Sequence, residues 1–166
     1  MVKIEPVIAT LSRNNVEFVI IGGIAFRIHS ASHSTFDFDL CYKRTKENFS
    51  RIVAALAPFD PRPRDFPDNL PFIFDESSLS NGTNFTFQST LGDIDLLGEV
   101  AGLGTYEDVK ATANNMRLFG FDVLVLSVEG LIKAKRAAGR TKDLLVLPEL
   151  ETLLELKNEE NEEDAD

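Results

Sequence analysis

Residues 35–40 read Thr35-Phe36-Asp37-Phe38-Asp39-Leu40, in which apolar and acidic side chains alternate. In an extended strand, residues two apart project from the same face. Asp37 and Asp39 are therefore expected on one face, and Phe36, Phe38 and Leu40 on the other. Two like charges side by side repel, and no basic residue alternates with them to relieve the repulsion. The pattern predicts a cation between the carboxylates, and a hard divalent metal ion is a natural candidate because it prefers carboxylate oxygens.

A buried strand and a diglycine turn precede this segment. Residues 17–21 are nearly all apolar, as expected for a central strand that is covered on both faces. Gly22-Gly23 ends the strand, and residues 24–29 are expected to form a short helix. Glycine lets the backbone approach an anion closely and a helix amino terminus favours negative charge, so this turn could hold a phosphate. Any strand-to-helix turn can use glycine, however, and neither a P-loop lysine nor a dinucleotide fingerprint accompanies it.

A second Asp-x-Asp occurs in Gly92-Asp93-Ile94-Asp95-Leu96-Leu97. If the two acidic strands pair, up to four carboxylates meet on one surface, as a two-metal site requires. The alternative is that each pair lies on a solvated sheet face. Asp93, which follows Gly92, is also consistent with a turn residue. Asp95 is harder to explain in this way, because Ile94 and Leu96 flank it.

The remaining segments predict the secondary structure around these two strands. Helices are expected over 5–14 and 45–56, the second capped by Thr45. Five prolines between residues 57 and 71 indicate irregular connection. Ser127 and Gly139 are expected to cap a helix that ends at Ala138, Thr141 to cap the next stretch, and Pro148 to start a final helix through Leu156. Further strands are expected at 72–74, 84–87, 116–119 and 121–126. The order of elements predicts the α+β (α/β) class, with a mixed sheet flanked by helices and a helical carboxyl-terminal segment.

Length and charge indicate how the chain is organised. We expect a single domain over residues 1–157, with its carboxyl-terminal helices beginning near residue 127, and a disordered acidic tail over 158–166. The 166 residues have a net charge of −10, and without the six acids of the tail 21 acidic residues face 17 basic ones. This balance argues against extended non-specific binding to nucleic acid. One cysteine, Cys41, and the lack of an apolar run long enough to cross a bilayer predict a soluble cytoplasmic protein.

Five of the seventeen basic residues lie between residues 131 and 143. On a helix, Lys133, Arg136 and Arg140 share one side, which most often is a solvated face. Lys135 is expected on the inward side of the same helix, so its ammonium must reach a polar cavity or a carboxylate. A phosphate and a structural ion pair would satisfy it equally well. His29 and His33 are interpreted as surface or packing residues rather than as ligands, and Cys41 as a buried residue.

Together these features resemble the nucleotidyltransferase superfamily of the DNA polymerase beta type. The closest resemblance is to its small bacterial branch, allied to abortive-infection and toxin–antitoxin nucleotidyltransferases. In that superfamily a strand that ends in Gly-Gly or Gly-Ser precedes a helix and an Asp-x-Asp strand, and a third Asp comes from a later strand. The matching residues here are Gly22, Gly23, Asp37, Asp39 and Asp95. The branch's helical Lys and its Gly-Arg-x-Lys-Asp segment match Lys135 and residues 139–143, so the resemblance covers roughly residues 5–156.

The resemblance implies a metal-dependent transfer of a nucleoside monophosphate from an NTP such as ATP, with release of pyrophosphate. The acceptor would be an RNA, a protein or a small molecule. The protein would act in a toxin–antitoxin or phage-defence system with a cognate antitoxin or toxin as partner, and without a membrane. Two Mg²⁺ ions, replaceable by Mn²⁺, would be held by the catalytic residues Asp37, Asp39 and Asp95, with Asp95 as general base or metal-bridging group. The triphosphate would contact Gly22, Gly23, Lys135 and Lys142.

The sequence departs from the family pattern at two positions. Gly23 stands where many relatives have Ser, which removes one hydroxyl contact, and His33 stands where many have Arg before the residue that matches Thr35. Two other hypotheses stay open from the sequence. The chain could be a non-catalytic member of the same fold that binds a nucleotide or a partner, or a structural domain whose carboxylates are solvated.

Overall fold

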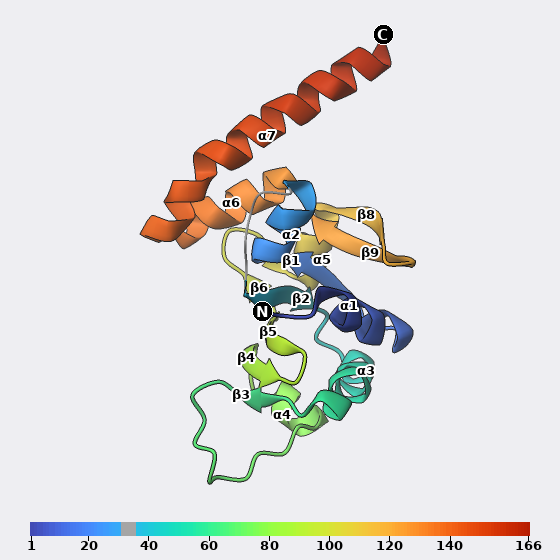
Figure 1. Ribbon diagram of the computed structural model, residues 1–166, viewed down its shortest axis with the longest axis vertical. Coiled ribbons are helices and arrows are strands. Elements are labelled where there is room, and N and C mark those ends of the chain that lie inside the picture. The colour runs from blue at the N-terminus through green and yellow to red at the C-terminus, as the bar shows by residue number, and fades with distance from the viewer. Residues whose placement is uncertain (31–35) are drawn as a thin grey trace.

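The computed structural model describes residues 1–30 and 36–166, and a mixed sheet runs through the middle of them (Figure 1). Seven strands lie in the order β3-β4-β5-β2-β1-β9-β8 within these residues. Their bounds are β1 Phe18–Ile21, β2 Asp37–Tyr42, β3 Arg62–Pro63, β4 Asn84–Ser89, β5 Gly92–Leu97, β8 Ala113–Leu118 and β9 Phe121–Leu126. β1 pairs antiparallel with β2 and parallel with β9, and β2 pairs parallel with β5. A two-stranded ribbon of β6 (Glu99–Val100) and β7 (Gly104–Thr105) stands beside the sheet.

Helices flank this sheet, which confirms the predicted fold class. They are α1 Ile4–Arg13, α2 Gly22–His29, α3 Lys46–Leu56, the 3-10 turn η1 Ala57–Phe59, α4 Glu76–Ser80, α5 Tyr106–Ala111, α6 Val128–Ala138 and α7 Thr141–Ala165. α1 packs against α3, and α2 lies between β2 and α6. Figure 1 shows α6 and the start of α7 near α2, whereas the rest of α7 projects away from the body.

Strand burial follows the alternation read from the sequence. All four residues of β1 are buried, as a strand covered on both faces requires. In β2, Phe38 and Leu40 are fully buried while Asp37 and Asp39 are partly exposed. Burying an apolar side chain of this size contributes roughly 1.5–3 kcal/mol, so the apolar face sets which way the carboxylates point. Phe36 differs from the expectation: it is 69% exposed, because β2 begins only at Asp37.

The predicted caps of two helices are confirmed. The side chain of Thr45 accepts a hydrogen bond from the Asn48 backbone N–H at the start of α3. At the start of α6, Ser127 accepts one from the Gly130 backbone N–H. α6 ends at Ala138, and its C-cap Gly139 has the left-handed conformation (φ 64°) that favours glycine at this position. These local signals place α6 directly after β9.

The segment between η1 and α4 was predicted incorrectly in two respects. Residues 72–74 were expected to form a strand, but they pair with no strand in the part of the chain that the structure describes. Phe72 and Phe74 instead pack on Phe87 of β4, with ring centroids 6.2 and 5.4 Å from it. Two partly buried aromatic side chains thus hold this segment on the sheet without a backbone ladder. Conversely, β3 lies inside the proline-rich connection, where Pro63 is tolerated because β3 is an edge strand.

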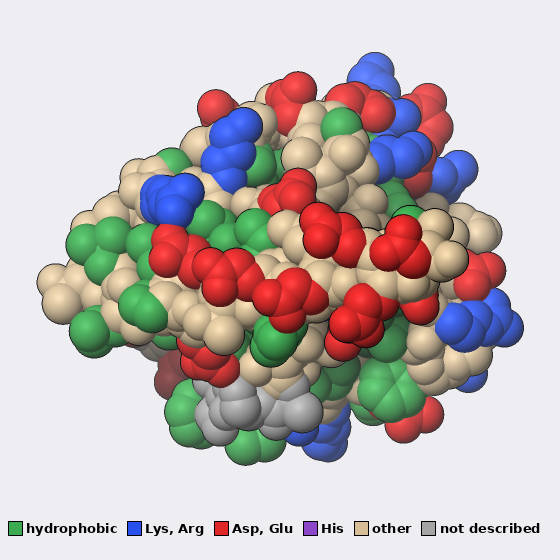
Figure 2. Space-filling view, turned by 90° about the horizontal axis from the view of Figure 1, so that it is seen from above, with side chains coloured by type: hydrophobic (Ala, Val, Ile, Leu, Met, Phe, Trp, Pro, Cys, Tyr) green, Lys and Arg blue, Asp and Glu red, His purple; other side chains and the backbone are tan. Residues whose placement is uncertain are grey.

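The carboxyl-terminal region also differs from the expectation. One helix, α7, begins at Thr141 after the N-cap Arg140, contains Pro148 in its interior and continues through Ala165. We expected a new helix at Pro148 and a disordered tail over 158–166. Glutamate favours helix and no glycine or proline follows Pro148, so nothing local ends the helix earlier. Figure 2, which looks onto this end of the molecule, shows acidic side chains gathered across the surface.

The described residues form no helix with both the length and the apolar character that crossing a membrane would require.

Candidate active site

The two Asp-x-Asp segments lie side by side in the sheet. β2 and β5 pair in parallel, with Asp37 opposite Asp93 and Asp39 opposite Asp95. Strand alternation then places all four carboxylates on one face, whereas Phe38 and Ile94 are buried on the other. From the sequence, the meeting of four carboxylates depended on whether the two acidic strands pair, and the structure shows that they do. We call the carboxylates of Asp37, Asp39, Asp93 and Asp95 the acidic cluster.

Asp39 and Asp95 lie directly opposite each other in the pairing of β2 with β5, so each carboxyl group affects the pKa of the other. Burial raises the pKa of Asp95 to about 7, and the negative charges of Asp39 and Asp37 also raise it, against the effect of Arg64. Burial is also the main reason why the pKa of Asp39 is raised. A carboxyl with a pKa near 7 retains its proton over much of the neutral range. In the metal-free protein, burial and the neighbouring carboxylates therefore keep Asp95 partly protonated beside Asp39 at neutral pH.

Gly22 touches the acidic cluster from the diglycine turn. Its φ of 63° is left-handed, and a Cβ added there would lie 2.3 Å from Asp39 Oδ2. Glycine is therefore required both by the backbone conformation and by the space that the Asp39 carboxylate occupies. Gly22 is the first residue of α2, and the N-cap Ile21 supplies no capping side chain to the first turn. The amino terminus of α2 thus opens beside Asp39, while Gly23 lies one residue further into the helix.

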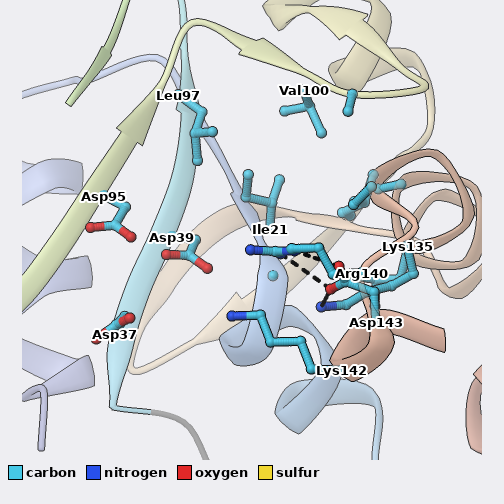
Figure 3. Close-up of a pocket in the computed structure, with 16 residues that line it drawn as sticks. Ile21, Asp37, Asp39, Asp95, Leu97, Val100, Lys135, Arg140, Lys142 and Asp143 are labelled. Carbon is cyan, nitrogen blue, oxygen red and sulfur yellow. Dashed lines mark hydrogen bonds and ion pairs between the residues drawn. The ribbon is translucent and has the colours of Figure 1, made fainter. Parts of the chain in front are cut away.

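Basic residues of α6 and α7 form the opposite side of the site, and most are paired. Lys135 Nζ lies 3.1 Å from Asp143 Oδ1, and Arg140 Nε lies 2.5 Å from Asp143 Oδ2. Asp143 is fully buried. Its burial alone would raise its pKa, but the hydrogen bonds from Arg140 and Lys135 outweigh this effect and lower the pKa to about 2. Of the two partners expected for Lys135, the structure shows the ion pair. Lys142 is exposed and its amine extends toward the acidic cluster (Figure 3).

A cleft of about 360 Å³ separates these two sides. The acidic wall comes from Asp37, Asp39 and Asp95, and the basic wall from Lys135, Arg140 and Lys142 (Figure 3). Gly22 also lines this cleft. Apolar side chains complete the lining: Ile21, Leu97, Val100, Ala101, Leu126, Leu131, Ala134 and Ala138. The cleft therefore offers carboxylates, amines and an apolar surface within one small volume.

Arg64 is the site residue that sequence reasoning missed. Its guanidinium pairs most closely with Asp95, through Nη2 and Oδ1. Arg64 Nη1 lies 3.4 Å from Asp93 Oδ2 and 3.6 Å from Asp37 Oδ2. The cation that the sequence predicted beside the carboxylates is thus supplied, in this arrangement, by the chain itself. The sequence signal that could have identified Arg64 is its position directly after Arg62 and Pro63, the two residues of the edge strand β3. The surrounding prolines indicated an irregular connection instead, so no strand was predicted there.

The carboxylates of the acidic cluster have the chemistry of metal ligands but are not arranged around a metal position. Carboxylate oxygens of Asp37, Asp39 and Asp95 are the ligands that Mg²⁺ and Mn²⁺ take in proteins. In the described residues, however, no three His, Cys, Asp or Glu side chains are arranged so that they could hold a metal ion. The chemistry of the cluster fits a divalent ion, whereas its present geometry accommodates the guanidinium of Arg64.

Two other predicted residues lie outside the acidic cluster. His29 Nε2 is 2.9 Å from the Leu126 carbonyl oxygen, and Nδ1 is 2.9 Å from Lys157 Nζ. Burial lowers the pKa of His29, and the contacts of its two ring nitrogens pack α2 against β9 and α7, as expected of a packing residue. Cys41 is buried, which confirms its interpretation. His33 lies outside the described residues.

Comparison with known proteins gives a structural likeness only. No protein-family model matches the sequence, and no curated protein matches it. The solved structure of the antibiotic-resistance factor ANT(2'')-Ia is similar, with 14% identity, 95% of this chain and 90% of that chain covered, and a TM-score of 0.53. TM1012 of Thermotoga maritima, provisionally described as a nucleotidyltransferase, has 15% identity, coverages of 92% and 89%, and a TM-score of 0.50. At such identities the likeness establishes the fold.

Proposed function

We propose that this chain, which has a nucleotidyltransferase-like fold, transfers a nucleoside monophosphate from an NTP to an acceptor hydroxyl. The observation that carries the proposal is the position of Asp39 and Asp95. Pairing of β2 with β5 brings the two carboxyl groups together beside Gly22, at the amino terminus of α2. Amines of α6 and α7 face them across a cleft. Neither feature alone indicates this reaction, but their combination in this fold supports it.

The cleft has the chemistry that a metal–nucleotide complex needs. The first turn of α2 offers backbone N–H groups and the positive end of the helix dipole to phosphate oxygens. Lys142 is exposed at the cleft and can pair with the same phosphates. Lys135 can reach them by adjusting its bond to Asp143. The apolar lining would contact the base or sugar, and a volume of about 360 Å³ is within the size range of small-molecule sites.

Asp37, Asp39 and Asp95 would hold the divalent ions, two Mg²⁺ or Mn²⁺. Bound there, these ions would neutralise the phosphate oxygens and the charge that develops as pyrophosphate leaves. In the transfer, the acceptor oxygen forms a bond to the α-phosphorus and the bond to pyrophosphate breaks. The acceptor's proton goes to a carboxylate oxygen of Asp95. The pKa of about 7 belongs to the metal-free protein; a bound divalent ion would lower it, so metal binding would release the Asp95 proton and leave a carboxylate that can accept one.

The acceptor is proposed as a class, and the biological setting with it. A terminal hydroxyl of an RNA, a hydroxyl of a protein or one of a small molecule would each fit the chemistry. A cognate toxin or antitoxin would be the natural macromolecular partner if the protein belongs to a two-component system. The net charge of −10 argues against broad binding to nucleic acid, so an RNA acceptor would be recognised at its end rather than along its length.

A second candidate function is nucleotide or partner binding without turnover. The observation that favours it is the acidic cluster as described, in which Arg64 pairs with Asp37, Asp93 and Asp95. If the guanidinium stays there, the chain could bind a nucleotide through its amines and the α2 terminus without assembling a metal site.

Labelled NTPs separate the two functions. The protein is incubated with each α-labelled NTP, Mg²⁺ and a cell extract, and both the labelled acceptor and the released pyrophosphate are measured. Transferase activity predicts labelling that Asp39→Asn abolishes, while Asp122→Asn retains it. Asp122 is the control because it lies on the surface in an ion pair with Arg117. Binding without turnover predicts thermal stabilisation by the NTP but no pyrophosphate, and that result would overturn the proposal.

A further inference from the structure

The guanidinium of Arg64 lies where a cation is needed. It contacts three of the four carboxylates of the acidic cluster, from Asp37, Asp93 and Asp95. Only 24% of the Arg64 side chain and 18% of the Asp95 side chain are exposed. In the described part of the chain, every ion pair of Arg64 is with this cluster. The residue therefore acts as the cluster's internal counter-ion.

The sheet fixes where the Arg64 side chain starts, but leaves its end movable. The Arg64 backbone N–H donates a hydrogen bond of 2.9 Å to the Thr86 carbonyl oxygen, and Thr86 lies opposite Asp95. The row from Arg64 through Thr86 and Asp95 to Asp39 thus crosses four neighbouring chain segments. From this anchored backbone the long arginine side chain extends to the carboxylates of Asp95, Asp93 and Asp37. Releasing its guanidinium requires only side-chain rotation, without breaking the sheet.

A guanidinium and a divalent ion compete for the same oxygen atoms. Asp95 Oδ1, the closest partner of Arg64, belongs to the set that would ligate a metal. A bound divalent ion would also repel a positive guanidinium a few ångströms away. Occupation of the cluster by Arg64 and its occupation by a metal are therefore mutually exclusive.

We propose that Arg64 is an internal gate of the cation site, which a metal ion enters only when the guanidinium leaves. This inference rests on the proposed metal site. A metal ion that arrives alone must displace the Arg64 guanidinium from the carboxylates, and it offers the guanidinium no other negatively charged partner. A metal ion that arrives with a nucleotide brings phosphate oxygens, which are strong partners for a guanidinium. The gate thus couples metal binding to nucleotide binding and keeps the nucleotide-free protein poor in metal.

Metal titration tests the gate without relying on activity. Mn²⁺ is titrated into the wild type, Arg64→Gln and Arg62→Gln at one pH, with calorimetry and paramagnetic resonance as readouts. Arg62 is the matched control, because it lies in the same segment and donates to the Leu70 carbonyl oxygen. We expect Arg64→Gln to bind Mn²⁺ about tenfold tighter than the wild type, and Arg62→Gln to match the wild type within about twofold. Adding Asp95→Asn to Arg64→Gln should abolish the gain.

A second measurement tests the coupling and guards against poor folding. A non-hydrolysable NTP analogue should strengthen Mn²⁺ binding to the wild type by at least about tenfold, and to Arg64→Gln by clearly less. If Arg64→Gln unfolds without metal, Arg64→Lys takes its place, because lysine retains the charge but loses the planar fork. An Mn²⁺ affinity of Arg64→Lys above that of the wild type supports the gate. An affinity between that of the wild type and that of the Arg64→Lys/Asp95→Asn double variant would contradict it.

Failure of the gate and failure of the proposed function look different. Equal Mn²⁺ affinity of the wild type and Arg64→Gln would overturn the gate and leave the metal site intact. Absence of Mn²⁺ binding in both proteins, with or without the analogue, would overturn the gate together with the metal-dependent function.

Discussion

Gly22 and Asp39 are in direct contact across the diglycine turn, because a Cβ at residue 22 would stand 2.3 Å from Asp39 Oδ2. The strand end, the start of α2 and the acidic cluster are therefore a single packed unit. A phosphate at the α2 terminus and a cation at Asp39 would lie next to each other for this reason. Because of this contact, the candidate site requires glycine at position 22 as much as it requires the carboxylate of Asp39.

Gly22→Ala should impair the site beyond its backbone cost. The left-handed φ penalises any Cβ by about 1 kcal/mol, and contact with Asp39 displaces the carboxylate. We expect a transfer rate reduced on the order of 100-fold, measured with the labelled-NTP assay. Gly120→Ala is the control: its φ is 85°, but nothing lies within 4 Å of an added Cβ. It should lose similar stability from the backbone alone and retain activity. Full activity of Gly22→Ala would contradict the contact.

The pH dependence of transfer should follow Asp95. In the metal-free protein its pKa is about 7, raised mainly by burial, so a metal ion competes with a proton for this carboxylate and metal loading becomes easier as pH rises through about 7. A rate measured from pH 5.5 to 8.5 should therefore rise to a plateau. A flat profile over this range, with Mg²⁺ below saturation and transfer still the slow step, would show that loss of the Asp95 proton does not control transfer.

The stability of the metal-free protein should change in the opposite sense. The folded-state pKa of Asp95 lies above its unfolded value of 3.8, so the folded state binds more protons between these values. The free energy of unfolding should fall as pH rises from about 4 to 7. Asp95→Asn should flatten this slope, as measured by urea unfolding at several pH values. An unchanged slope would assign the effect to other groups.

Asp143 should stabilise the protein at neutral pH and lose that effect in acid. Its folded-state pKa of about 2 lies below the unfolded value of 3.8, so its contribution is present above about pH 4 and disappears as pH falls through 2. The shift corresponds to about 2 kcal/mol. Asp143→Asn should lower the free energy of unfolding by at least this amount at pH 7, because Lys135 and Arg140 lose their shared partner. Equal stability of both proteins at pH 7 would refute the pairing.

Phe87 should be the main contact that holds residues 72–74 on the sheet. The ring is 2% exposed and meets Phe72, Phe74 and Phe85. Phe87→Ala should cost about 3–5 kcal/mol of stability in urea unfolding, because it leaves a large cavity. Phe36→Ala, at a residue 69% exposed, should change stability by less than about 0.5 kcal/mol. Similar losses for both variants would show that the aromatic cluster is not the cause.

Local rules predicted the features whose causes are local. Strand alternation placed Asp37 and Asp39 opposite Phe38 and Leu40, and the caps of α3 and α6 were readable because a capping side chain bonds a backbone N–H about three residues away. The same rules failed for residues 72–74, where packing on Phe87 replaced strand pairing, and at Pro148, which lies inside α7.

The sequence by itself determined that two acidic pairs exist, that each has one polar face, and that glycine precedes the first. The first two of these properties depend on residues only a few positions apart, and the third is read directly from the order of residues along the chain. Only the tertiary structure decided that β2 and β5 are neighbours, that Arg64 reaches Asp95 across 31 positions, and that Asp143 pairs with Lys135. Strand order and side-chain reach across a sheet depend on how the whole chain packs. For that reason the internal counter-ion of the acidic cluster became visible only in three dimensions.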